Sequence, residues 1–323
     1  MRTKFFVKAS LTILMVFTYT FLLAQIPQEA DSSKELSKEQ KKLPPVNLQN
    51  ESDSNQVIDV KKDCIPKKFF YIKNIPGDMV QLAKAPFQKK NLKGLVATAA
   101  ATGLLLFVDE PFTKGVRQFS RAIGVSTETS YYIPLKLGGT KLLKFPRNPT
   151  SFLYQLGEGA TTMVLAGGIY IFGEIKNDKR AIYTAGDLTE TFISMGIATQ
   201  IVKRITGRES PYQATQKGGR WSPLPSFSEY QKHTSHYDAF PSGHLATIMG
   251  TVTTLALDYP EKRWIKPVGY TVMGLVGLAM VNTEVHWVSD YPLALAMGYL
   301  SAKITHFKNH KCETKSHKLT DNF

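Results

Sequence analysis

A series of long apolar stretches, separated by short polar connectors, most constrains how this chain can fold. The stretches are rich in Ala, Leu, Gly, Met and Val and lack sustained two-residue alternation, so they predict helices rather than strands. A bundle of about six core helices is the simplest way to bury such stretches against one another, and we therefore expect an all-α fold. The stretches are residues 94–108, 152–173, 188–202, 243–257, 267–283 and 291–304.

Length and charge argue against a protein in which every one of these helices spans a membrane. Most of the uncharged runs have 12 to 17 residues, whereas a spanning helix takes about 20. By the positive-inside rule, the basic connector 258–267 would face the cytoplasm. With an exported N-terminus, three crossings would also place the 203–240 loop in the cytoplasm. One helix separates the two connectors, so both placements cannot hold if every helix spans the membrane. We favour an exported helical domain that rests on a membrane over a six-span protein.

The N-terminal segment has the pattern of a secretory signal peptide over residues 1–24. Arg2, Lys4 and Lys8 precede an apolar run, and the chain turns polar at Gln25. An uncleaved membrane anchor is the alternative interpretation. Residues 25–68 balance acidic and basic side chains and show no apolar period, which predicts a disordered linker. The helical domain is then expected over 69–310, followed by a basic tail at 311–323, and we expect a periplasmic, membrane-associated location.

The net charge favours an anionic partner. Lys and Arg number 40 against 26 Asp and Glu, a formal charge of +14. Removing the signal peptide lowers it to +11, and the linker contributes none, so the excess lies in the helical domain and tail. A phosphorylated small molecule, a phosphorylated lipid or an anionic membrane surface fits this charge. We expect no nucleic-acid partner, because no recognition motif is present. Cys64 and Cys312 flank the domain, and the sequence leaves open whether they pair.

Three polar segments stand out beside apolar helices. The first is residues 203–211 (KRITGRESP), the second is residues 240–244 (FPSGH), and the third is residues 285–290 (VHWVSD). In the second, Ser242 is a good N-cap, Gly243 lets an oxyanion approach the backbone, and the following helix offers free N–H groups. His244 then lies in the first turn as a general acid beside a bound anion.

The third segment places His286 and Asp290 four residues apart. On a helix this spacing puts the two side chains on one face. A carboxylate at one imidazole nitrogen fixes the tautomer and makes the other nitrogen a better base or nucleophile. Taken alone, a His and an Asp at this spacing are more often an exposed surface pair.

In this order and context, the three segments resemble those of the type 2 phosphatidic acid phosphatase (PAP2) superfamily. The family includes bacterial acid phosphatases, lipid phosphate phosphatases and vanadium haloperoxidases. The resemblance covers about residues 94–307 and is strongest over 203–290, and it implies a PAP2-like helical bundle.

The resemblance also implies a role for each matching residue. His286 would be the nucleophile that forms a phosphohistidine, Asp290 would orient it, and His244 would protonate the leaving alcohol. Lys203, Ser242 and the Gly243 backbone N–H would bind phosphate oxygens. No metal or other cofactor is implied for hydrolysis, and phosphate or vanadate would be the anion in the site.

Two departures from the family pattern bear on activity. Ser210 and Met280 stand where the family has phosphate-binding arginines. Neither side chain can replace the bidentate fork of Arg, and losing one transition-state donor typically costs about 10²–10³ in rate. Arg208 is two residues from Ser210, and we consider it as a phosphate ligand from a shifted position.

Three functions therefore remain open. The first is an exported phosphatase that hydrolyses a phosphomonoester or a lipid (pyro)phosphate. The second is a catalytically weak or inactive relative that binds anionic lipid or phosphate. The third is a vanadium haloperoxidase, which is the least favoured because retention of vanadate would depend on the same missing arginines.

Several further residues are weaker candidates. Asp109 and Glu110 are adjacent, so their side chains point different ways and a helix end is the favoured interpretation. His233 and His236 are expected to form a solvated loop pair, and Trp287 is expected to pack. His306, His310 and His317 resemble metal-ligand spacing, but no acidic or Cys cluster supports them in sequence, so no metal site is expected.

Overall fold

The structure is a computed structural model that describes residues 70–137 and 140–310. The predicted signal peptide (1–24), the linker (25–68), the basic tail (311–323) and both cysteines lie outside these described residues and stay predictions.

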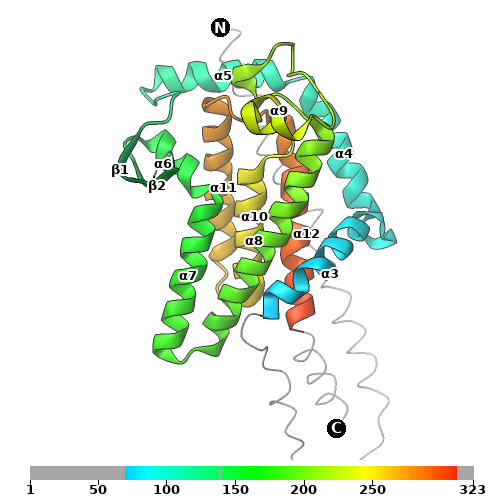
Figure 1. The fold of residues 1–323 in the computed structure, drawn as a ribbon, viewed down its shortest axis with the longest axis vertical. Helices are drawn as coiled ribbons and strands as arrows, with labels where there is room; N and C mark the ends of the chain where they lie inside the picture. Colours follow the sequence, from blue (N-terminus) through cyan, green and yellow to red (C-terminus); the bar gives the residue numbers. More distant parts are fainter. Residues whose placement is uncertain (1–69, 138–139, 311–323) are drawn as a thin grey trace, which may run out of the picture. The chain divides into compact units, whose positions relative to one another are not determined.

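The described residues confirm the expected all-α fold (Figure 1). The α-helices are α3 (Phe70–Lys84), α4 (Leu92–Leu106), α5 (Asp109–Ala122), α6 (Pro149–Leu156), α7 (Gly159–Lys176), α8 (Lys179–Thr206), α9 (Phe227–Lys232), α10 (Gly243–Asp258), α11 (Ile265–Asn282) and α12 (Tyr291–Asn309). Short 3₁₀ turns are η2 (Ala85–Phe87), η3 (Lys89–Asn91), η4 (Pro211–Gln213), η5 (Thr234–His236) and η6 (Val288–Asp290).

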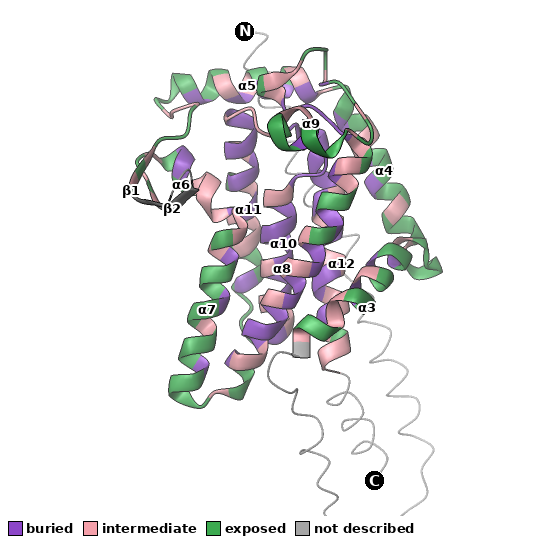
Figure 2. Cartoon of the chain, in the orientation of Figure 1, coloured by how far each residue is buried: buried purple, intermediate pink, exposed green. Residues whose placement is uncertain are grey.

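Helix α10 lies at the centre of the bundle. It packs against α7, α8, α11 and α12, and Figure 2 shows most of its length as buried. Helices α3 and α4 pack against α12, and α5 packs against the upper end of α11 in the view of Figure 1. The bundle therefore holds the start of α10 and the end of α8 in fixed positions at one end.

The stretch 152–173 is not one helix, as the apolar run predicts, but two. It divides between α6 and α7 at Gly157, where a Cβ atom would lie 2.9 Å from the Cβ of His244. The close approach of α10 therefore requires glycine at the break.

A small antiparallel hairpin precedes this break and was not expected from the sequence. Strands β1 (Tyr131–Leu137) and β2 (Thr140–Pro146) pair with Tyr131 opposite Pro146 and Leu137 opposite Thr140. The hairpin packs against α6 and adds no layer to the bundle.

Helix α8 ends at a glycine that the local geometry requires. Gly207 has φ +56, and a Cβ there would lie 1.8 Å from the carbonyl oxygen of Ser222. Only glycine fits this left-handed cap. The cap ends α8 just beyond Lys203 and sends the chain into the 207–242 segment, which carries α9.

One described helix, Ile265–Asn282, is long and apolar enough to cross a membrane. A second span is counted if the bent pair Lys89–Leu106 and Asp109–Ala122 is taken as one.

Candidate active site

The three segments singled out in the sequence meet at one end of the bundle. Ser242 is the N-cap of α10, and its side chain accepts a hydrogen bond from the N–H of Leu245 at 3.4 Å. The N–H of Ser242 donates to the carbonyl of Asp290 at 3.1 Å, which joins the second segment to the third. From the end of α8, Lys203 Nζ lies 3.8 Å from where a Cβ of Gly243 would be. A cation therefore lies beside the free N–H groups of α10.

His286 is buried and held in one orientation. Its Nδ1 lies 2.8 Å from the carbonyl oxygen of Ala239, so Nδ1–H is the donor and Nε2 keeps its lone pair. The ring of His244 lies next to it, with 5.6 Å between ring centroids and an interplanar angle of 69°. The two histidines and Lys203 thus come together as the sequence predicts.

The predicted arrangement of His286 and Asp290 on one helix face is wrong. His286 lies in the connector, and Asp290 ends η6 before α12 begins at Tyr291. Asp290 Oδ2 accepts the N–H of Trp287 at 2.8 Å and lies 3.6 Å from His286 Nδ1. Asp290 therefore acts on His286 as a nearby charge and a connector cap, while Ala239 supplies the direct acceptor.

Arg208 is not a phosphate ligand, which corrects the expectation from sequence. Its side chain is fully buried, and all five N–H donors are engaged by protein. The acceptors are Asp109 Oδ2 (2.7 Å), Asp290 Oδ1 (2.5 Å), Ser289 Oγ (2.7 Å) and, twice, the carbonyl of Gly218 (3.2 and 2.8 Å). With its donors used, the guanidinium holds Asp290 rather than a substrate.

Asp109 is a member of this network that sequence reasoning missed. It was expected to mark a helix end, and it does begin α5, but its carboxylate is buried. It accepts from Arg208 and from both the N–H and the hydroxyl of Ser289. No local pattern indicates this, because its partners are far away in the chain.

Two tryptophan rings lie against the Arg208 guanidinium. Its Cζ lies 4.9 Å from the ring centre of Trp221 and 5.3 Å from that of Trp287. Trp287 is buried, and its Nε1–H donates to the carbonyl of Glu209 at 2.8 Å. Trp287 therefore packs, as expected.

The expected loop histidines lie beside Glu209. His236 Nδ1 is 3.5 Å from the Glu209 carboxylate, and the His233 ring contacts His236 edge-on. His233 is exposed.

The pKa of His244 lies well below its usual range. Burial is the largest cause, and electrostatic interactions with His286, Lys203 and Lys144 lower the pKa further. Lys144, from β2, pairs with Glu158, and the Tyr154 ring contacts His244 with centroids 4.8 Å apart. Lys144 and Tyr154 carry no motif, so only the fold could reveal them.

The two positions that lack the family arginines are both buried. Ser210 is 2% exposed and Met280 is fully buried. Lys203 is in turn 3.5 Å from Asp238. The positive charge at the centre of the site is therefore carried by Lys203 and the N-terminus of α10.

An apolar groove of about 580 Å³ runs along α10 from one turn beyond His244 toward the opposite end of the helix. Leu156, one of its lining residues, directly precedes the Gly157 that packs on His244, and Ile248 lies one turn of α10 beyond His244. The rest of the lining comes mainly from α7, α10 and α11 and includes Thr162, Leu165, Val252, Tyr259, Trp264 and Val268.

Comparison with known proteins agrees with this geometry. Residues 184–312, which contain all three segments, match the model of the PAP2 superfamily. The chain therefore carries a PAP2 superfamily domain. It is also similar to a lipid A 1-phosphatase of Porphyromonas gingivalis, with 30% identity over 80 residues. That match covers 24% of this chain and only 18% of the length of the relative. No solved structure gives a significant match.

Proposed function

We propose that this protein is a PAP2-type phosphatase that hydrolyses a phosphorylated lipid through a phosphohistidine intermediate. The observation that carries the proposal is the oriented His286. Its Nδ1–H is held by Ala239, so the Nε2 lone pair is available next to His244, Lys203 and the start of α10. This arrangement combines a nucleophile, an acid and a phosphate cradle.

The first step transfers the phosphoryl group to the protein. His286 Nε2 forms a bond to phosphorus as the P–O bond to the leaving alcohol breaks, and protonated His244 gives its proton to that oxygen. Lys203, the Ser242 hydroxyl and the N–H of Gly243 bind the phosphate oxygens. Asp290 balances the positive charge that His286 gains.

The second step restores the protein. Water attacks phosphorus, neutral His244 takes the proton of the water, and the N–P bond breaks to release inorganic phosphate. Vanadate and inorganic phosphate are expected to compete for the same cradle.

A lipid is favoured over a soluble phosphate ester by the apolar groove. The groove begins one turn of α10 beyond His244 and is lined mainly by apolar side chains, so it would accommodate an acyl chain whose phosphate lies at His286. The name of the relative, a lipid A 1-phosphatase, gives the same substrate class.

Exposed apolar side chains support a membrane-associated location, and the signal-peptide pattern of residues 1–24 supports export to the periplasm. On α7, Val164, Ile171 and Ile175 lie on one face and are 75%, 59% and 71% exposed. Phe107 after α4 is 83% exposed. A membrane surface would cover these side chains, and basic residues would attract it if its lipids are anionic.

A competing function is the binding of phosphorylated lipid with little or no turnover. Ser210 and Met280 provide no guanidinium, and Arg208 is fully engaged elsewhere. Losing two transition-state donors would slow the reaction strongly.

Phosphate release and phosphoenzyme trapping decide between these functions. Full-length protein in detergent would be given a long-chain lipid phosphate carrying ³²P in its phosphate group, and a short-chain soluble ester labelled likewise. We expect release and an acid-labile, base-stable phosphoenzyme from the wild type and from His233→Ala, an exposed loop control. His286→Ala should give neither. Lipid binding by a wild type that releases no more phosphate than His286→Ala would favour the competing function.

A further inference from the structure

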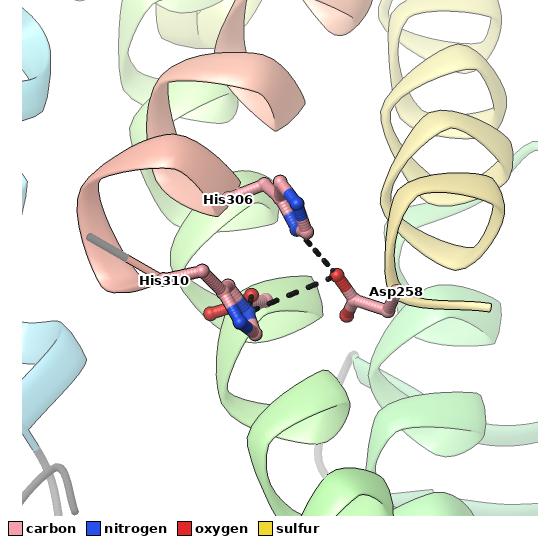
Figure 3. Close-up of side chains that lie close together, drawn as sticks. Asp258, His306 and His310 are labelled. Atoms are coloured by element: carbon pink, nitrogen blue, oxygen red, sulfur yellow. Dashed lines mark hydrogen bonds and ion pairs between the residues drawn. The ribbon is translucent and has the colours of Figure 1, made fainter. Parts of the chain in front are cut away.

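A second polar cluster lies at the end of the bundle opposite the candidate active site. Asp187 on α8, Asp258 at the end of α10, His306 on α12 and His310 directly after α12 lie close together there. Figure 3 shows both histidine rings beside the Asp258 carboxylate. Asp187 and Lys203 are both on α8 and sixteen residues apart, which corresponds to about 24 Å along the helix. This cluster is therefore separate from the site of phosphate chemistry.

The four side chains are arranged as metal ligands would be. One ligand atom from each lies within 4.8 Å of all the others. His306 Nδ1 is 2.7 Å from Asp258 Oδ1, and His310 Nε2 is 2.9 Å from Asp187 Oδ2 and 4.0 Å from Asp258 Oδ1. Ligands of a tetrahedral ion with bonds of about 2.0–2.1 Å lie roughly 3.4 Å apart. Shifts of about an ångström in these side chains would produce that geometry.

A buried oxygen without a hydrogen-bond partner among the described residues is a second observation that favours a cation at this cluster. Asp258 is only 6% exposed, and its Oδ2 makes no hydrogen bond with any of the described residues. Such an atom is costly to bury unless something binds it. Because it belongs to a proposed ligand, a metal ion would satisfy it.

A hydrogen bond from Asn309 orients Asp187, one of the four candidate ligands. Asn309 Nδ2 donates to Asp187 Oδ1 at 2.7 Å and to Glu190 Oε2 at 2.9 Å. Hydrogen bonds of this kind fix the orientation of metal-ligating side chains.

Negative charge is in excess around the cluster. Asp78, Asp187, Glu190 and Asp258 are all at most 6% exposed, and Lys308 is the lysine that pairs with Asp78 and Glu190. A divalent ion would compensate this charge when the histidines are neutral.

We propose that Asp187, Asp258, His306 and His310 bind one divalent transition-metal ion, with zinc as the best match. Two imidazoles exclude the hard oxygen-preferring ions Mg²⁺ and Ca²⁺ as first choice, and four protein ligands make a closed structural site. The ion would fasten α8, α10 and α12 together. The spacing of His306 and His310 in the sequence shows no acidic partner nearby. The fold brings Asp187 from α8 and Asp258 from α10 to these histidines.

Metal analysis and thermal unfolding of the full-length protein test this proposal. After dialysis against Zn²⁺ and then against metal-free buffer, we expect about one equivalent of zinc, and a lower melting temperature after chelation. Co²⁺ in place of zinc should give the visible absorption of a tetrahedral site. Asn309→Ala should weaken binding about 10- to 100-fold.

Variants locate the ion. His306→Ala and the isosteric Asp258→Asn should lose it, and the second keeps the test decisive if the first fails to fold. His233→Ala, His286→Ala and the tail variant His317→Ala should keep it. The proposal is overturned if the wild type holds no zinc and its melting temperature ignores Zn²⁺. It is also overturned if Asp258→Asn and His306→Ala retain a full equivalent, because the ion then binds elsewhere and the histidines form only ion pairs.

Discussion

Arg208 and Asp109, 99 residues apart in the chain, form a fully buried ion pair with Nη2 and Oδ2 2.7 Å apart. Through its other amino group Arg208 also holds Asp290. The start of α5 is thus tied to the connector that carries His286. Arg208 of the first segment therefore positions Asp290 of the third segment.

Removing one partner of this pair should strongly destabilise the protein. Asp109→Ala leaves the Arg208 charge short of one carboxylate in a buried environment, and we expect a loss of about 3–5 kcal/mol in the free energy of unfolding. Urea denaturation followed by circular dichroism measures it. Glu110→Ala is the matched control, because the Glu110–Lys114 pair is partly exposed and should contribute under about 1 kcal/mol. Equal losses in both variants would contradict the assigned role of Asp109.

Restoring a guanidinium at position 210 should accelerate phosphate release. Ser210 lies two residues after Arg208 in the first segment, at the position where the family has a phosphate-binding arginine. Ser210→Arg should raise kcat by about tenfold or more. One such donor typically changes the rate by about 10²–10³, and the cost of placing a larger side chain at this buried position reduces the increase. Ser210→Gln adds comparable length without charge and should not. A gain in both variants would show that the charge is not the cause.

Local patterns were sufficient to predict the apolar helices of the bundle and the start of α10, but not α3, α5 or α9. Ser242 caps α10 because an N-cap residue directly precedes an apolar run, and this signal is contained within a few residues. The apolar run does not indicate the break at Gly157, and the side chain that requires glycine there, His244, is far along the chain. Where a contact with another helix determines the local structure, the local sequence pattern does not reveal it.

The errors in the site have the same origin. Arg208 was considered as a phosphate ligand because it is close in sequence to the missing arginine, but its acceptors come from α5 and η6. The four-residue spacing of His286 and Asp290 predicts one helix, but α12 begins only after them, at Tyr291, with Pro292 in its first turn. Residue identities in the three segments could be predicted, whereas their hydrogen-bond partners required the fold.

The pH dependence of kcat/KM should show a His244 that is hard to protonate. Its pKa is below the ordinary value of about 6.5, so His244 is neutral at pH 7 and gains its proton only as pH falls. Because the first step needs the protonated form, kcat/KM should rise as pH decreases from 7 toward that pKa.

Lys144 provides the test of this assignment. Lys144→Ala removes one positive charge and frees Glu158, and both changes raise the pKa of His244. The rise in kcat/KM should then begin at higher pH than in the wild type, while Lys217→Ala in the 207–242 segment should leave the profile in place. A profile that does not move in Lys144→Ala would mean that another group provides the proton.

Filling the apolar groove should discriminate against long acyl chains only. Leu165 lines the groove, and Leu165→Trp would exclude about two methylene groups of a bound chain. At about 0.8 kcal/mol per buried methylene, KM for a long-chain lipid phosphate should rise about tenfold, with no change for a short-chain ester. Val164 is 75% exposed and is not among the groove residues, so Val164→Trp is the matched control. If Leu165→Trp changes KM for both substrates alike, or for neither, the acyl chain does not bind between α7, α10 and α11.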